Sequence, residues 1–220
     1  MGINRQGFKY LPKVYKSPSL IVPCFQVKGT YTMSEVVLIR SLAFEKMKDA
    51  GIKAICFDKD NVLTAPYVSE LYPSLKNAWE ECQQVFKDKI AILSNSAGSM
   101  DDIGYKAASA AERSLKVPVI RHRLKKPDNG ILIIRHFQVP PQKIVVVGDR
   151  LFTDILMGNM DEMLTIHTQP LTAKGEELSI RYMRKFENTL LQYITTKYPP
   201  SQAPPHPFYR PSFIRTPMNV

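Results

Sequence analysis

The sequence predicts an α/β protein, a doubly wound parallel sheet with helices on both faces. Short, nearly continuous apolar runs alternate along the chain with longer segments whose apolar residues recur at helical spacing. Strands that are buried on both faces have this composition, because helices cover a parallel sheet on each side. In addition, four of the apolar runs are followed by polar side chains, which is where such sheets bind ligands.

The expected elements follow one another in order. We expect strands at 53-57, 89-93, 117-120, 143-147 and 163-167. Helical patterns occupy 34-50, 74-87, 100-115, 128-138, 152-159 and 175-197.

Two of these helices carry specific expectations about packing. In 34-50, the residues of one stripe should face the sheet, namely Val36, Ile39, Ala43, Met47 and Ala50. Leu38, Leu42, Val37 and Phe44 fall off that stripe. Trp79, and the aromatic residues Tyr182, Phe186 and Tyr193 in the last helix, are expected to pack inside the protein.

The chain should form one domain with two appendages. Residues 1-33 are expected to be irregular and basic, 34-197 to form the folded domain, and 198-220 to be an extended tail, because 199-220 hold seven of the 17 prolines. No apolar run is long enough to cross a bilayer.

The net charge of +10 comes entirely from the two ends. Residues 1-34 and 181-220 contribute +5 each, whereas the middle holds 19 basic and 19 acidic residues. Basic ends favour an anionic surface, either nucleic acid or anionic lipid, although solvation of loose ends gives the same pattern.

Polar groups at four strand ends form an ordered set. Asp58 and Asp60 follow the first strand, Ser94 and Asn95 follow the second, and Lys126 comes before a helix, beyond the third. Asp149 follows the fourth strand, and Asp154 comes five residues later. Each alone is consistent with capping or a salt bridge, but the set in this order resembles the haloacid dehalogenase (HAD) superfamily of phosphotransferases.

This resemblance implies a HAD-like Rossmannoid fold and a role for each motif. Asp58 would attack the phosphoryl group and form an aspartyl-phosphate, while Asp60 would act as the general acid and base. Ser94, Asn95 and Lys126 would surround the phosphoryl oxygens. A Mg²⁺ cofactor would be held by Asp58, Asp149 and the backbone carbonyl of Asp60, with Asp154 in support.

The intervals between motifs predict a HAD fold without a cap domain. Asp60 and Ser94 are 34 residues apart, and Ser94 and Lys126 are 32 apart, which the expected elements fill. An uncapped site suits a substrate whose bulk stays outside, such as a protein, a nucleic acid end or a lipid headgroup.

Finer stretches narrow the resemblance to the mitochondrial phosphatidylglycerophosphate phosphatase family. They are SPSLIVP (17-23), FDKDNVLTAPY (57-67), SNSAGS (94-99), VIRHRLKKP (119-127) and VVGDRLFTDILMGN (146-159). The family converts phosphatidylglycerophosphate to phosphatidylglycerol on the way to cardiolipin. The resemblance therefore implies an anionic phospholipid substrate and a peripheral position on the matrix side of the inner mitochondrial membrane.

Four further residues are candidates for the substrate mouth: Tyr67, His122, Arg123 and Arg150. Arg150 could hold the second phosphate of the headgroup or pair with a neighbouring acid. Tyr67 could equally be a loop anchor, and His122 and Arg123 could be structural.

Two other functions remain open. A polynucleotide or protein phosphatase would also have an open site and basic ends, although no aromatic and basic residues interleave as they do in base-stacking proteins, so no nucleic acid partner is expected. A mainly structural subunit of a mitochondrial membrane complex is the third possibility, with membrane proteins as partners.

Overall fold

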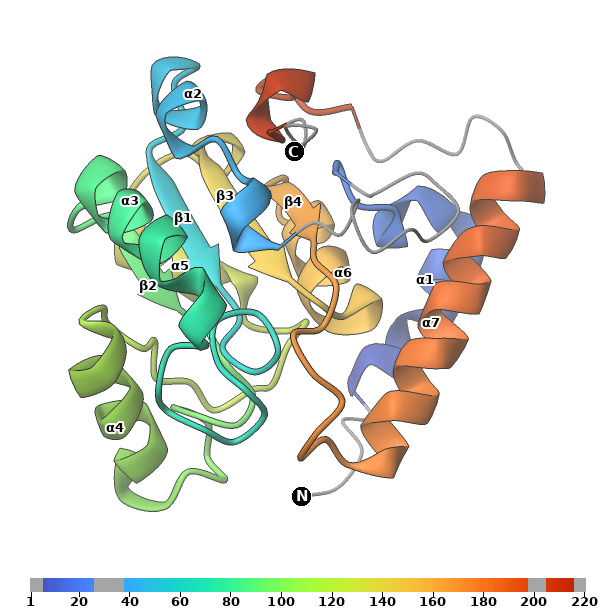
Figure 1. Cartoon of the computed structure of the whole chain (residues 1–220). Coiled ribbons are helices and arrows are strands. Elements are labelled where there is room, and N and C mark those ends of the chain that lie inside the picture. The colour runs from blue at the N-terminus through green and yellow to red at the C-terminus, as the bar shows by residue number, and fades with distance from the viewer. Residues whose placement is uncertain (1–5, 26–37, 198–204, 216–220) are drawn as a thin grey trace.

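The predicted parallel sheet is present. The computed structural model describes residues 6–25, 38–197 and 205–215 of the chain. Within them, one sheet has the order β2-β1-β3-β4, and every neighbouring pair is parallel (Figure 1). Its strands are β1 (Ala54–Phe57), β2 (Ile90–Ile92), β3 (Ile144–Gly148) and β4 (Leu164–His167). All lie at the predicted places but for the final residue of β3.

The fifth predicted strand, 117-120, is reduced to a single bridge. Val119 pairs in parallel with Ile92 at the outer edge of β2. Pro118 accepts a hydrogen bond from Ile92 through its carbonyl oxygen but has no N–H to donate. This edge therefore forms no continuous ladder.

Helices cover both faces, as a doubly wound fold requires. One apolar cluster joins the sheet to α2 (Phe44–Asp49), α3 (Lys76–Phe86) and α4 (Lys106–Leu115). A second cluster joins the other face to α5 (Gly130–Phe137) and α6 (Leu156–Met160). The α/β class is therefore confirmed.

The predicted helix at 34-50 is interrupted. A 3₁₀ turn, Ile39–Ser41, precedes α2, and the backbone at Leu42 between them is extended. Helical periodicity does not continue through an extended residue, so Leu42 and Phe44 are fully buried although they fall off the predicted stripe. Ile39, Ala43 and Met47 are buried as expected, and Val36 lies outside the described residues.

The N-terminal segment is not irregular over its described part. It forms a 3₁₀ turn (Gln6–Tyr10), α1 (Leu11–Lys16) and a second 3₁₀ turn (Pro18–Ile21). Pro12 is the second residue of α1, and Pro18 is the first residue of the 3₁₀ turn. In the first turn of a helix, a missing N–H leaves no helical bond unmade. These prolines therefore begin helical turns instead of preventing them.

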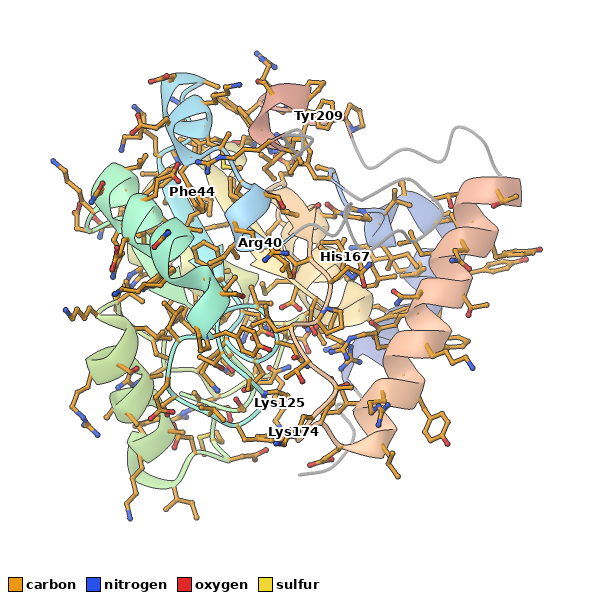
Figure 2. All side chains as sticks on the ribbon, viewed as in Figure 1. Arg40, Phe44, Lys125, His167, Lys174 and Tyr209 are labelled. Carbon is orange, nitrogen blue, oxygen red and sulfur yellow. The ribbon has the colours of Figure 1, made fainter. Side chains whose placement is uncertain are left out.

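The proline-rich tail packs against the domain through its described residues, 205–215. Phe213 is fully buried, and its carbonyl oxygen accepts a hydrogen bond from the Ala43 N–H at 2.9 Å. The Tyr209 ring stacks on Phe25 with 4.7 Å between centroids. Tyr209 and Phe44 lie near the same end of the molecule (Figure 2). The prediction of an extended, free tail is therefore wrong for residues 205–215.

The last helix, α7 (Leu178–Lys197), runs along the flank beside α1 (Figure 1). Leu191 and Ile194 of α7 share an apolar cluster with Val14 of α1 and Leu151. Tyr182, Phe186 and Tyr193 are exposed, so their predicted core position is wrong, whereas Trp79 is buried as expected. No helix in the described part of the chain is both long and apolar enough to span a membrane.

Candidate active site at the carboxyl edge of the sheet

Asp58 and Asp149 come to adjacent positions because their strands are neighbours. Phe57 of β1 is in register with Val147 of β3, and the N–H of Asp58 donates to the Val147 carbonyl at 2.9 Å. The chain leaves β1 toward β2 on one side and places β3 on the other, so the two aspartates stand where the strand order reverses. Ligands bind at such switch points in open α/β sheets.

Lys126 lies between two of the predicted carboxylates. Its Nζ is 2.8 Å from Asp58 Oδ1 and 2.5 Å from Asp154 Oδ1, and its side chain is almost completely buried. Asn95 positions this lysine, since Asn95 Oδ1 accepts the Lys126 N–H at 3.0 Å. The structure thus brings residues of all four motifs into one cluster.

Asp60 is held above the cluster by its own loop. Its Oδ1 accepts hydrogen bonds from Lys59 Nζ at 2.6 Å and from the Tyr67 N–H at 2.8 Å. Its Oδ2 accepts a hydrogen bond from Ser96 Oγ. Ser96 Oγ also lies 3.1 Å from Ser94 Oγ, so a hydroxyl pair links the first two motifs.

Lys59 and Ser96 are site residues that the sequence reasoning missed. Lys59 is buried and also donates to the Val68 carbonyl at 2.8 Å, so it closes the loop that carries Asp60. The signal for Ser96 was its place in SNSAGS, two residues after the predicted Ser94.

Three carboxylates are arranged so that they could hold a cation. Asp58, Asp149 and Asp154 each offer an oxygen, and these oxygens lie within 4.8 Å of one another. Hard carboxylate oxygens are the ligands that Mg²⁺ prefers, so the residues fit the predicted ion. Asp154 belongs to this group directly, whereas the Asp60 carboxylate does not.

Burial governs the proton affinity of this cluster. Burial raises the pKa of Asp58 to about 6, although Lys126 opposes the shift. Burial also raises the pKa of Asp149 to about 6, against the opposing charge of Arg184. A bound cation would favour the charged form of both aspartates.

The C-terminal helix supplies a wall of the site. Arg184 donates to Asp149 Oδ2 through Nη2, and to Glu176 through Nη1 at 2.7 Å. Arg150, a predicted mouth residue, is ion-paired through Nη2 to Glu187 Oε1 at 2.9 Å. Motifs at strand ends give no signal for Arg184 or Glu187, because both belong to a helix that follows the sheet.

The remaining mouth candidates separate into two kinds. Tyr67 lines the pocket, and its hydroxyl donates to Glu177 Oε1 at 3.2 Å. His122 is buried, with its Nε2 at 2.8 Å from the Ser94 carbonyl oxygen, so it supports the loop from beneath. Arg123 is exposed and is not among the residues that line the pocket.

A pocket of ≈ 120 Å³ opens above the cluster. Its floor contains Asp58, Ser94, Lys126 and Asp149, and its walls include Tyr67 and Ile180. No separate cap domain is found among residues 6–25, 38–197 and 205–215; the beginning of α7 and the segment before it form the wall instead. A carboxylate nucleophile, a second carboxylate and a lysine around one small pocket can perform phosphoryl transfer to water.

Comparisons with known proteins agree with this chemistry. The family described as "Mitochondrial PGP phosphatase" matches residues 6–172. The Arabidopsis thaliana protein "Phosphatidylglycerophosphate phosphatase 1, chloroplastic/mitochondrial" is 37% identical over 193 residues, which cover 86% of this chain and 53% of that protein. The Chlamydomonas reinhardtii protein "Phosphatidylglycerophosphate phosphatase 1, chloroplastic" is 41% identical over 151 residues, or 68% of this chain and 56% of that protein.

A yeast relative matches over nearly its whole length. The Saccharomyces cerevisiae protein "Phosphatidylglycerophosphatase GEP4, mitochondrial" is 34% identical over 198 residues, which cover 87% of this chain and 96% of that protein. By contrast, this chain spans only about half the length of the plant and algal relatives. The family match ends at residue 172, before α7 begins.

Proposed function

The chain belongs to the mitochondrial PGP phosphatase family, and from this premise we propose that it hydrolyses the terminal phosphate of phosphatidylglycerophosphate. The products are phosphatidylglycerol, on the way to cardiolipin, and inorganic phosphate. The observation that carries the proposal is the position of Asp58, which lines the pocket with its carboxylate 2.8 Å from Lys126 Nζ and has Asp60 two residues away.

The residues can be assigned to two successive steps. In the first, a carboxylate oxygen of Asp58 attacks phosphorus, and the bond from phosphorus to the glycerol oxygen breaks. Asp60, protonated for this step, gives its proton to the leaving oxygen. In the second, Asp60 takes a proton from water, the water oxygen attacks the aspartyl-phosphate, and Asp58 is released with inorganic phosphate.

Surrounding groups stabilise the charge that this chemistry moves. Lys126 and the Ser94 hydroxyl lie where they can bind phosphoryl oxygens, since both line the pocket beside Asp58. When bound to Asp58, Asp149 and Asp154, Mg²⁺ supplies the positive charge that lets an anionic nucleophile approach an anionic phosphate.

The proposed place of action is the matrix side of the inner mitochondrial membrane, at its surface. The name of the yeast relative, which is mitochondrial, supports the organelle in this proposal. The substrate would stay in the membrane by its acyl chains and offer only its headgroup.

The test is phosphate release from three substrates presented at equal concentration. They are phosphatidylglycerophosphate in detergent micelles, a phosphopeptide and a 3′-phosphorylated oligonucleotide. We expect release from the lipid in the presence of Mg²⁺, and none from the lipid with the Asp58→Asn variant. Faster release from the peptide or the oligonucleotide would overturn the substrate assignment, and no release from any of them would favour a structural role in a membrane complex.

A further inference from the structure

Exposed apolar side chains lie in, or next to, the segments that line or border the pocket. Six of them come from four separate segments, and we call them the apolar rim: Tyr67, Val68, Met100, Ile103, Leu124 and Leu178. Ile103 is 84% exposed, Leu178 65%, Met100 62% and Leu124 55%. A single exposed apolar residue is ordinary on a protein surface, but several around one site indicate an interaction surface.

Contacts place one half of the rim beside the pocket. Tyr67 lines the pocket, and Val68 is its neighbour in the chain. Glu177, which also lines the pocket, accepts the hydrogen bond of the Tyr67 hydroxyl at 3.2 Å and is followed directly by Leu178. The loop after β1 and the beginning of α7 therefore meet at the mouth.

The other half of the rim is joined to the pocket through Lys125. Leu124 precedes Lys125, which lines the pocket and forms an ion pair with Asp101. Met100 precedes Asp101, and Ile103 stands two residues after it. This ion pair ties the loop after β2 to the loop that carries Lys126.

The charges near the rim favour an anionic partner. Arg123 and Lys174 are exposed cations beside Leu124 and the beginning of α7. Lys125 and Lys174 lie toward the same end of the molecule (Figure 2). Three of the carboxylates nearby have partners in the protein: Asp101 pairs with Lys125, Glu176 pairs with Arg184, and Glu177 accepts from Tyr67. Glu70, two residues after Val68, is an exposed carboxylate.

We propose that the apolar rim inserts into the interface of an anionic bilayer and seats the pocket directly over the lipid headgroups. The inference rests on the proposed function, because this orientation serves only an enzyme whose substrate is embedded in a bilayer. Interfacial apolar groups are buried to about 5–10 Å, at the boundary between headgroups and acyl chains. At that depth, a headgroup enters the pocket while its acyl chains remain in the membrane.

Two rim residues and one matched control can test this orientation. Ile103→Ser and Leu178→Ser each remove an exposed apolar side chain from a different side of the mouth. Tyr193→Ser is the control, because Tyr193 is an exposed aromatic residue of the same helix, 15 residues beyond Leu178. That spacing separates the two by about 22 Å along the helix axis. The thermal unfolding midpoint of each variant shows whether its fold is retained.

The measurement is sedimentation with vesicles of phosphatidylcholine alone, or of equal parts phosphatidylcholine and phosphatidylglycerol. We expect the unmodified protein to bind the mixed vesicles more tightly, and each rim variant to lose roughly threefold to tenfold in affinity for them. The Tyr193→Ser variant should bind like the unmodified protein.

Three results would overturn the proposed orientation. They are unchanged vesicle binding by both rim variants, an equal loss with Tyr193→Ser, or equal binding of the unmodified protein to the two kinds of vesicle. Failure of the proposed function looks different: the unmodified protein would bind vesicles through its rim and yet release no phosphate from phosphatidylglycerophosphate in micelles.

Discussion

Arg184, in the second turn of α7, donates a hydrogen bond to Asp149 at the carboxyl end of β3. A cation is therefore held by the protein itself at a carboxylate that belongs to the proposed Mg²⁺ site. The same guanidinium bonds to Glu176, which ties the segment before α7 to the sheet edge. The Arg184 side chain therefore connects the proposed metal site to the wall of the pocket.

Replacing Arg184 should affect stability and metal binding in opposite directions. Arg184→Gln leaves the buried Asp149 without its cation, so we expect the metal-free protein to lose roughly 3–5 kcal/mol of unfolding free energy. Mg²⁺ should bind several-fold more tightly, because a competing positive charge is gone. Urea unfolding and calorimetric titration measure the two effects. Arg181→Gln, on the exposed face of α7, should change neither, and weaker Mg²⁺ binding by Arg184→Gln would contradict the competition.

Asp58 should be essential for turnover but not for folding. Asp58→Asn keeps the shape of the side chain and removes the attacking charge, so we expect phosphate release to fall by roughly 10³-fold or more. Asp88→Asn is the control, since Asp88 is exposed and precedes β2 at the opposite edge of the sheet. Near-normal, metal-dependent turnover by Asp58→Asn would exclude the covalent mechanism.

Metal binding should weaken as the pH falls. Because burial raises the pKa of Asp58 and of Asp149 to about 6, protons compete with Mg²⁺ for both carboxylates below that pH. The Kd for Mg²⁺ from calorimetric titration should therefore rise steeply between about pH 7 and pH 5. A chelator should abolish turnover, and so should Asp149→Ala. A Kd that is constant across this range would contradict the proposed ligands.

Asp154 allows a finer test of the metal site. Its carboxylate oxygen lies within 4.8 Å of one oxygen each of Asp58 and Asp149, so Asp154→Ala should reduce Mg²⁺ affinity as strongly as Asp149→Ala. A clearly milder effect would instead fit the supporting role that the family resemblance implies for Asp154.

Asp102 should stabilise the loop after β2. Its carboxylate accepts hydrogen bonds from the N–H groups of Gly98, Ala107 and Ala108 at 2.9 Å each. Although burial opposes the shift, these donors lower its pKa. A lowered carboxyl pKa stabilises the fold above the unfolded value near 4, and this contribution is lost as the pH falls through the folded value. Asp102→Ala should therefore cost about 1–2 kcal/mol at neutral pH, measured by urea unfolding, and the deficit should shrink in acid.

The tail should contribute to global stability through one side chain. Phe213 is fully buried in the main apolar cluster, so Phe213→Ala should lower the unfolding free energy by roughly 3–5 kcal/mol. Ser212→Ala, at the adjacent exposed position, is the control. If both variants unfold alike, the tail does not pack on the domain in solution.

Much of the sheet and the cluster could be predicted because both rest on local patterns. Apolar runs such as 54–57 and 144–147 are strands, and strand ends must meet at one edge once the sheet is parallel. The single bridge at Val119 had a signal in the sequence, because Pro118 lies inside the apolar run 117-120 and has no N–H for a ladder.

The last helix shows why the remainder could not be predicted. Its aromatic residues suggested a buried face, yet Arg184 and Glu187 are buried while Tyr182 and Phe186 are exposed. The charged residues face inward because Asp149 and Arg150 lie opposite them. Spacing along a helix cannot show which partners the sheet will offer.

The wall that α7 adds to the pocket has a consequence for how selectivity can diversify. The carboxylates and Lys126 lie within residues 58–154, whereas Glu176, Ile180 and Arg184 line the pocket from a segment beyond the family match. A change in that segment reshapes the mouth without altering β1 or β3. Residues of α7 that face the mouth can therefore vary while the strands stay the same, provided that Arg184, which bonds to Asp149 of the floor, is kept.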